Sequence, residues 1–377
     1  MELFDALVVG GGPAGSSCAR KLVAGGLRVA VLDAARFPRV KLCAGWVSPP
    51  VWTELELLPG SYPHGLWEWS RMHVHLAGRT RTERIRGYFI RRYEFDHFLL
   101  QRSGAEVREH RVQKIEREGA HFVVDGAFSA RFLVGGGGTN CPVARQLFVP
   151  KERKPVATQE REFEAGAGAV AARRMGGDGE PEILLHDDLG GYSWNIPKTG
   201  WVNVGCGTVQ PRALLPAWRE ARAFFEGSGH LPDASGAALD EVKGHSYHLF
   251  RSRHLSTCEN QGAAVIGDAL GLAHPLTGEG ILPAVVSGGL CAEAILSGRI
   301  ADYPRLLARH RLFRDYRIIA ALVETVSRAR APFRLRPLFS PLVAKLFALS
   351  FSARALPAGG ALSRGLDLLR RQGARHD

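Results

Sequence analysis

The first 33 residues carry the pattern that most restricts the fold of this chain. A short apolar run leads into Gly10-x-Gly12-x-x-Gly15, a helix-forming segment follows, and a second apolar run ends at Asp33. In such a strand–turn–helix–strand unit the glycines permit a tight turn, close approach of a pyrophosphate and packing of the helix on the strand. The acid is placed to accept hydrogen bonds from a ribose. The order of the elements predicts a dinucleotide site, against the alternative of a plain glycine-rich turn.

A second pattern lies far along the chain, at residues 262–284, where an apolar strand runs into a loop and then a helix. Its candidate residues are Gly267, Asp268, Pro275, Gly278, Gly280 and Ile281. An acid so distant from Asp33 suits an elongated dinucleotide such as FAD, with Asp268 on a ribityl hydroxyl. The helix N-terminus after Gly280 directs backbone amides at the pyrimidine end of a flavin, where they stabilise the charge of the reduced ring. The alternative is a structural corner with an aspartate at the helix N-cap.

Length and composition favour a cytoplasmic enzyme. A chain of 377 residues allows two or three domains and a large core. Its six cysteines are scattered without a CxxC pair, which argues against a zinc site or a disulfide framework and for a reducing compartment. The first strand is expected from residue 6, so we predict no secretory signal, and no apolar run is long enough to span a membrane.

The charge is concentrated at the end of the chain. Residues 299–377 hold 16 of the 49 Lys and Arg but only 5 of the 37 Asp and Glu, so this tail carries nearly all of the net charge of +12. Within it, residues 327–356 set arginines beside phenylalanines and leucines. This arrangement predicts docking on an anionic membrane surface, at the inner face of the membrane, and the alternative is an ordinary helical subdomain. Interleaved aromatics for base stacking are missing, so we expect no nucleic acid partner.

These patterns resemble the geranylgeranyl reductase family of FAD-dependent flavoproteins, within the glutathione-reductase-like group that includes the aromatic hydroxylases. The resemblance covers about residues 1–300. Beyond the two patterns above, it rests on Arg92-x-x-Phe95-Asp96, on Lys41-Leu-Cys43-Ala44-Gly45, and on Tyr192-Ser-Trp194-Asn-Ile196-Pro197-Lys198 followed by Asn203-Val204-Gly205. It implies that Arg92 helps to hold FAD and that the loop bearing Cys43 lies at the flavin, facing the substrate. The cofactor-binding residues expected in all are Gly10, Gly12, Pro13, Ala14, Gly15, Asp33, Lys41, Cys43, Ala44, Arg92, Gly267, Asp268, Pro275, Gly278, Gly280 and Ile281.

Cys43 is the candidate with the most open role. A thiol beside the flavin positions the substrate, gates the flavin or donates a proton, and Lys41 nearby favours the thiolate. Without the resemblance, a lone cysteine is more often a small buried hydrophobe. Trp46 follows this loop where the family commonly has a small residue, so we expect it to reshape the substrate pocket.

Tyr192, Trp194 and Ile196 alternate, so in a strand they face the same side. They form either the roof of an elongated apolar pocket or an ordinary buried sheet face, and the resemblance favours the pocket. The candidate catalytic residues are Cys43, Tyr192 and Trp194. The residues assigned to the substrate pocket are Trp46, Tyr192, Trp194 and Ile196. We expect no metal site.

The expected fold class is α/β, with a Rossmann-like FAD-binding domain of the glutathione-reductase type. An antiparallel β-sheet substrate domain is inserted into it, and a basic helical region ends the chain. The boundaries are 1–60, 85–150 and 255–300 for the FAD domain, 61–84 and 151–254 for the substrate domain, and 301–377 for the helical region.

The resemblance implies a reductase of carbon–carbon double bonds in an apolar, geranylgeranyl-type lipid substrate. The alternative enzyme is a flavin monooxygenase or halogenase acting on an aromatic or polyketide-like substrate, although no counterpart of the halogenases' catalytic lysine is found. A third, non-enzymatic interpretation is a basic flavoprotein scaffold that binds a membrane or nucleic acid. No separate second Rossmann pattern identifies the electron donor, so NADPH, a ferredoxin and a quinol all stay open.

Overall fold

A computed structural model of the chain describes residues 1–148, 155–165, 179–228, 231 and 239–328. Its strands form two sheets of eight strands each. The first has the order β15-β16-β9-β1-β2-β6, with β7 and β8 attached to β9. The strands of this sheet are β1 (Glu2–Val9), β2 (Val29–Asp33), β6 (Glu106–Glu109), β7 (Ile115–Glu118), β8 (His121–Val124), β9 (Phe128–Gly135), β15 (Glu259–Asn260) and β16 (Ala263–Val265).

The centre of the first sheet is parallel and fully buried. β1 pairs with β2 on one side and with β9 on the other, and β9 pairs with β16, all in parallel. Their apolar runs are buried on both faces, as expected when helices cover a parallel sheet. The covering helices include α1 (Pro13–Ala24) and α8 (Ile281–Leu296). The strand, turn and helix expected at each of the two sequence patterns are therefore confirmed.

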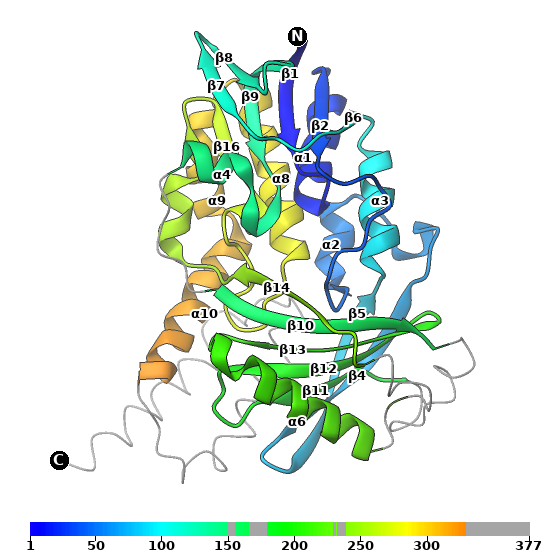
Figure 1. Ribbon diagram of the computed structural model, residues 1–377. Coiled ribbons are helices and arrows are strands. Elements are labelled where there is room, and N and C mark those ends of the chain that lie inside the picture. Colours follow the sequence, from blue (N-terminus) through cyan, green and yellow to red (C-terminus); the bar gives the residue numbers. More distant parts are fainter. Residues whose placement is uncertain (149–154, 166–178, 229–230, 232–238, 329–377) are drawn as a thin grey trace, which may run out of the picture.

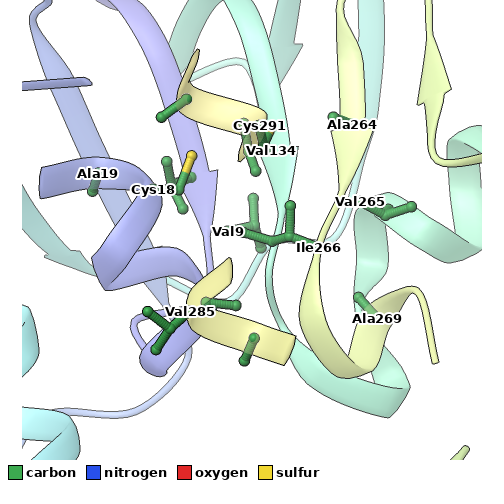
Figure 2. Close-up of a cluster of buried hydrophobic side chains, with 14 of the residues drawn as sticks. Val9, Cys18, Ala19, Val134, Ala264, Val265, Ile266, Ala269, Val285 and Cys291 are labelled. Carbon is green, nitrogen blue, oxygen red and sulfur yellow. The ribbon is translucent and has the colours of Figure 1, made fainter. Parts of the chain in front are cut away.

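Helices α1 and α8 come from opposite ends of the described chain and pack closely together (Figure 1). A Cβ atom on Gly288 of α8 would lie 2.3 Å from the carbonyl oxygen of Ala14 in α1, so only glycine permits this crossing. Figure 2 shows the core beside it, where Cys18 of α1 and Cys291 of α8 lie near Val9 and Val134 of the sheet. All six cysteines are free thiols.

The second sheet has the order β14-β10-β13-β12-β11-β4-β5-β3. It is antiparallel except where β11 runs parallel to β4. Its strands are β3 (Trp46–Val47), β4 (Trp67–Leu76), β5 (Arg79–Phe89), β10 (Pro155–Glu164), β11 (Glu182–Leu185), β12 (Gly191–Lys198), β13 (Trp201–Thr208) and β14 (Lys243–His248).

The two faces of the second sheet pack against different parts of the molecule. Helix α6 (Leu214–Gly227) packs Trp218 and Phe225 against Val202 and Val204 of β13, and it lies on the side of the sheet away from the first sheet (Figure 1). Side chains alternate along a strand, so the residues between these valines face the first sheet instead. Helix α6 thus covers one face of the second sheet, and the other face is directed at the first sheet.

The boundaries predicted for the domains stay a prediction, but the strand pairing assigns two segments differently. Strand β3 and residues 85–89 of β5 pair in the second sheet, although we predicted both in the first domain. The reason is that β5 is one strand from Arg79 to Phe89 and pairs with β4 on both sides of a register shift between Trp69 and Arg71, so a boundary at residue 84 would divide one strand.

The remaining helices are α2 (Pro49–Glu54), α3 (Arg92–Arg102), α4 (Pro142–Leu147), α9 (Tyr303–Arg309) and α10 (Arg311–Arg328). The described part of the chain beyond residue 300 is helical, as predicted. Among the described helices, none combines the length and the apolar composition needed to cross a membrane. The segment predicted to dock on a membrane, 327–356, lies outside the described residues except for its first two, which end α10.

Candidate functional site

A cavity of about 420 Å³ lies between the two sheets. Its first wall comes from the carboxyl ends of the parallel strands and the loops that follow them, and its second wall comes from the open face of the antiparallel sheet. The volume is in the range of small-molecule sites, and the ends of parallel strands are where open α/β sheets bind ligands. We therefore treat this cavity as the candidate functional site.

The glycine turn forms the centre of the first wall. Gly10 has a φ of +107°, and a Cβ there would lie 2.6 Å from the carbonyl carbon of Gly136. A Cβ on Gly15 would lie 1.9 Å from the carbonyl oxygen of Gly10, so this residue lets α1 start close to β1. A Cβ on Gly12 would meet only the Arg39 guanidinium, at 3.6 Å, because Gly12 faces the cavity.

The N-terminus of α1 is open to an anion. Its N-cap, Gly12, offers no side-chain hydrogen bond to the first backbone amides, which are left for a ligand. Asp33 stands beside this turn and accepts hydrogen bonds from the backbone amides of Gly11 at 2.7 Å and Ala35 at 2.9 Å. These bonds hold the Asp33 carboxylate at the cavity edge, where its remaining lone pairs can accept from hydroxyls.

The second sequence pattern completes the first wall. Helix α8 begins at Ile281 after Gly280, again without a side-chain cap, and Asp268 lines the cavity next to this turn. Gly278 has a φ of +72°, and a Cβ there would lie 2.1 Å from the hydroxyl of Tyr247. Two helix N-termini from distant parts of the chain therefore open into one cavity.

Glu279, within that turn, is a buried acid. Its carboxylate accepts a hydrogen bond from the Ser48 hydroxyl at 2.6 Å. Burial raises the pKa of Glu279 to about 7, although the bond from Ser48 works in the opposite direction. The carboxyl is consequently part protonated near neutral pH.

A cationic group stands at the edge of the same wall. The Arg92 guanidinium donates to both oxygens of Asp96, at 2.5 and 2.7 Å, and Arg39 approaches the same carboxylate at 3.4 Å. Burial lowers the pKa of Arg92, but the Asp96 carboxylate outweighs this effect and holds the pKa above its ordinary value. Arg39, Lys41 and Arg92 all line the cavity, which gives it positive charge for phosphate groups.

The loop of Cys43 is fixed between the two sheets. Its amide donates to the Glu160 carboxylate, its carbonyl oxygen lies 3.5 Å from both the Lys198 ammonium and the Asn203 amide nitrogen, and its sulfur accepts from the Gly45 amide at 3.3 Å. Cys43 lines the cavity and is partly exposed, whereas the other five cysteines are buried. The position of the thiol at the cavity agrees with the expectation, and its chemical role stays a prediction.

The second wall carries the large side chains. In the register of the sheet, Trp194 lies opposite Gly205, and a Cβ on that glycine would be 2.3 Å from the indole ring. The indole nitrogen of Trp194 donates to Asn203 at 2.7 Å, and the Tyr192 hydroxyl donates to the carbonyl of Thr277. Tyr192, Trp194 and Ile196 all line the cavity, so they share one face as the alternation predicts.

Trp46 closes one end of this wall. Its ring meets that of Trp69 edge-on at a centroid distance of 4.5 Å and that of Phe89 at 5.3 Å. The three rings form a buried aromatic block in which only Trp46 reaches the cavity. Such a block is rigid and apolar, so it limits how far a ligand extends in this direction.

The structure gathers nearly all of the predicted site residues around this cavity. Those that line it are Gly10, Gly12, Pro13, Ala14, Asp33, Lys41, Cys43, Ala44, Trp46, Arg92, Tyr192, Trp194, Ile196, Asp268, Gly278, Gly280 and Ile281. Gly15, Gly267 and Pro275 do not line it. The two glycines act in packing instead, since a Cβ on Gly267 would lie 2.9 Å from that of Ala14.

Seven polar residues of the cavity were not predicted: Arg39, Thr158, Glu160, His245, Tyr247, Thr277 and Glu279. The only available signal for the strand residues was the repeated acid in Thr-Gln-Glu-Arg-Glu-Phe-Glu, at 158–164, which places carboxylates on alternate positions. That alternation shows that they share a face, but it does not show that the face is buried. In the described ranges no cluster of His, Cys, Asp and Glu has the composition to hold a metal ion.

No protein-family model matches the chain. Among curated proteins, it is 29% identical to a menaquinone reductase of Mycolicibacterium smegmatis over 343 residues, which cover 81% of this chain and 80% of that one. It is 28% identical to a geranylgeranyl diphosphate reductase of Rhodobacter capsulatus over 322 residues, which cover 79% and 78%.

Two solved structures illustrate the likeness in fold. A geranylgeranyl bacteriochlorophyll reductase-like protein from Thermoplasma acidophilum has a TM-score of 0.70 at 20% identity, covering 98% of this chain and 100% of that one. A flavin-dependent brominase has a TM-score of 0.68 at 17% identity, covering 99% and 100%. With the parallel sheet and the glycine turn, these neighbours show a mixed α/β, Rossmann-like nucleotide-binding fold.

Proposed function

We propose that this chain, which belongs to the geranylgeranyl reductase family of FAD-dependent oxidoreductases, reduces carbon–carbon double bonds in an apolar, isoprenoid substrate. The single observation that carries the proposal is the pairing of two unlike walls around one cavity. One wall offers open backbone amides and acids, and the other offers aromatic and aliphatic side chains. The first suits a dinucleotide, and the second suits an apolar substrate laid against it.

The first wall fits FAD. The uncapped N-terminus of α1 and the open Gly12 suit the pyrophosphate, Asp33 suits the adenosine ribose, and Asp268 suits the ribityl chain. The N-terminus of α8 would stabilise negative charge on the flavin ring. Bound and reduced, FAD supplies the hydride for the reaction, whereas the protein orients the substrate and excludes water.

The finer architecture is part of the same proposal. We assign the parallel sheet to a FAD-binding domain of the glutathione-reductase type and the antiparallel sheet to an inserted substrate domain. The support is that the second sheet contributes the face with Tyr192, Trp194 and Ile196, while every glycine of the turn belongs to the first. On this assignment Trp46 sets the depth of the substrate pocket, and Cys43, Tyr192 and Trp194 position the alkene.

The alternative function is that of a flavin-dependent monooxygenase or halogenase. The brominase favours it by fold, but at 17% identity that likeness concerns the fold alone. The two curated relatives, at 28% and 29% identity over most of their length, are both named as reductases. The reductase is therefore the function we argue.

The electron donor and the location are proposed from the sequence. NADPH, a ferredoxin and a quinol are the candidate donors. The basic residues of 327–356 suit docking on an anionic membrane surface, from which a lipid substrate would reach the cavity. Binding to anionic vesicles at low salt that is lost at high salt would support docking, whereas no binding at low salt would overturn it.

The deciding experiment is a single anaerobic turnover. The purified FAD-loaded protein is reduced chemically and mixed with geranylgeranyl diphosphate or with menaquinone, and the lipid is analysed by mass spectrometry. A gain of about two mass units per reduced double bond, located in the isoprenyl chain of the lipid and coupled to anaerobic reoxidation of the flavin, supports the reductase. A gain of oxygen that occurs only in air supports the monooxygenase, and no change in the mass of the isoprenyl chain or of the whole lipid in either condition would overturn both.

A further inference from the structure

One carboxyl group on the second wall has no evident structural partner for its outer oxygen. Glu160 lies in β10, opposite Gly205 of β13, and its side chain lines the cavity with only 2% of the residue exposed. Oε1 accepts the hydrogen bond from the Cys43 amide. Oε2 is buried and makes no hydrogen bond of good geometry among the described residues, although the Asn203 side chain is close enough to lower the pKa of the carboxyl as a hydrogen-bond donor. A carboxylate is rarely left so in a folded protein, because an unpaired buried charge is costly.

The surrounding charges do not neutralise Glu160 directly. The cation that acts on Glu160, Lys198 at the end of β12, is paired with Glu162, which also accepts from Arg91 at 3.0 Å. The other groups that face Glu160 are the Cys43 amide from the loop and the Asn203 side chain from β13. Glu160 therefore lies beside the Lys198–Glu162 ion pair but is not a member of it.

This environment favours the protonated acid. Burial raises the pKa of Glu160 to about 7, and the negative charge of Glu162 adds to the effect. Lys198, the Cys43 amide and Asn203 act in the opposite direction and do not cancel it. A carboxylic acid with a pKa near the working pH is well matched to proton transfer.

We propose that Glu160 is the general acid that protonates the substrate carbon during alkene reduction. The inference rests on the proposed function. One alkene carbon accepts the hydride, which brings both electrons from reduced FAD. As the second carbon gains its proton, the O–H bond of Glu160 breaks and a C–H bond forms, leaving the electron pair on the carboxylate. The substrate is reduced by two electrons, the flavin is oxidised by two, and a proton from water restores the acid.

Other groups of the cavity are less suited to this step. The Tyr192 hydroxyl is already donated to the Thr277 carbonyl, and burial raises the pKa values of Tyr192 and Tyr247 above their ordinary range. Burial lowers the pKa of His245 to about 3, so this imidazole is neutral and holds no acidic proton at pH 7. Glu279 has a similar pKa to that of Glu160 but accepts from Ser48, on the first wall.

Two substitutions separate an acid from a positioning residue. Glu160→Gln keeps the shape and the acceptor for the Cys43 amide but removes the transferable proton, whereas Glu160→Asp keeps the acid and shortens its reach. If Glu160 is the acid, the single-turnover rate of alkene reduction falls by about 100-fold or more in the Gln variant and by less in the Asp variant. The matched control is Glu164→Gln, at the exposed end of the same strand, which should react like the parent.

The dependence on pH gives the second test. In the parent, the rate should fall as pH rises through about 7, because the acid must be protonated, and this fall should be missing from Glu160→Gln. Equal rates for the parent and the Gln variant, or a Gln variant faster than the Asp variant, would overturn the inference while leaving the proposed function intact. If the parent itself reduces no alkene under any condition, the proposed function fails, and the inference with it.

A measurement without turnover completes the design. Infrared difference spectra of the oxidised, FAD-loaded protein should show two protonated carboxylic acids that titrate near pH 7, one from Glu160 and one from Glu279. Glu160→Gln should lose one of the two signals, and Glu279→Gln should lose the other. A Glu160→Gln spectrum with the same titration as the parent would overturn the assignment of Glu160 as a protonated acid.

Discussion

The two walls of the cavity bind by different means. The first presents backbone: open amides at two helix N-termini and glycines with no room for a side chain. The second presents side chains of the antiparallel sheet, from Glu160 and His245 to Tyr192 and Trp194. A wall of backbone tolerates little change, because each position is fixed by the chain path. A wall of side chains can be altered one residue at a time while the sheet is kept.

This difference allows one fold to carry different side chains at its site. Proteins named as a reductase-like protein and as a brominase superpose on nearly all of this chain, at identities of 20% and 17%. If the first wall is kept, the site for a cofactor is kept. If side chains of the second wall are replaced, the groups that face this cofactor site change. The comparison predicts that substitutions in the first wall affect folding and cofactor binding, and those in the second affect the reaction.

The largest effect is expected from Gly15→Ala. Because the new Cβ would lie 1.9 Å from the Gly10 carbonyl oxygen, α1 must shift, and we expect a loss of about 3 kcal/mol or more in unfolding free energy together with the bound FAD. Chemical denaturation and the flavin absorbance measure the two effects. Gly60→Ala, where nothing lies within 4 Å, is the control. A variant that binds FAD and has the same unfolding free energy as the parent would contradict the prediction for the first wall.

The next effect concerns pH and Glu279. Its pKa is raised in the folded protein to about 7 from 4.5, so the folded state holds the proton more tightly than the unfolded state does. The resulting stability is complete below about pH 4.5 and is lost as pH rises through about 7, by roughly 3 kcal/mol. Glu279→Gln should remove this contribution, whereas the similar contribution of Glu160 should remain. Urea unfolding of both proteins between about pH 5 and 8 measures it, and parallel curves would contradict the prediction.

A smaller effect is expected from Asp268→Asn. The change removes a charge at the cavity edge while keeping the size of the side chain, and we expect the FAD dissociation constant to rise about tenfold, or about 1.4 kcal/mol. Titration of the flavin-free protein with FAD gives the constant. Asp302→Asn, on a partly exposed acid beside Arg299, should leave it unchanged. Equal FAD affinity in the Asp268 variant and the parent would remove Asp268 from the cofactor site.

The smallest effect is expected from Cys43→Ser. This substitution tests whether a residue of the cavity can alter the reaction without altering FAD affinity. The loop is held by its backbone, through the bonds to Glu160 and Asn203, so the substitution should leave FAD affinity within about twofold. We expect a change of several-fold in turnover or in the distribution of products, since the thiol faces the cavity. Identical rates and products would make Cys43 a packing residue.

The first wall was largely predictable from the sequence, because its signals are local. Glycines at 10, 12 and 15 and the acid at 33 have fixed spacings within one strand–turn–helix–strand unit, and the structure has that unit. The second wall was only partly predictable. The shared face of Tyr192 and Trp194 follows from alternation within β12.

Glu160 could not be found in the same way. Whether its face of β10 is buried depends on pairing with β13 and β14, which lie about 40 to 90 residues further along the chain. Nothing local fixes that pairing. The position of β3 was missed for a similar reason, since a two-residue strand has no pattern of its own and is defined only by its partner β5.

The crossing of α1 and α8 also bears on how the protein is made. Because Gly288 rests on the backbone of α1, the first helix completes its packing only after a segment more than 250 residues downstream has been translated. At about 5–20 residues per second, the newly made N-terminal unit waits about 15 to 50 s for its partner. Protease treatment of stalled ribosome-bound chains that end before or after α8 would show whether α1 becomes protected only in the longer ones. During that interval the apolar face of a nascent α1 is the surface that a chaperone would cover.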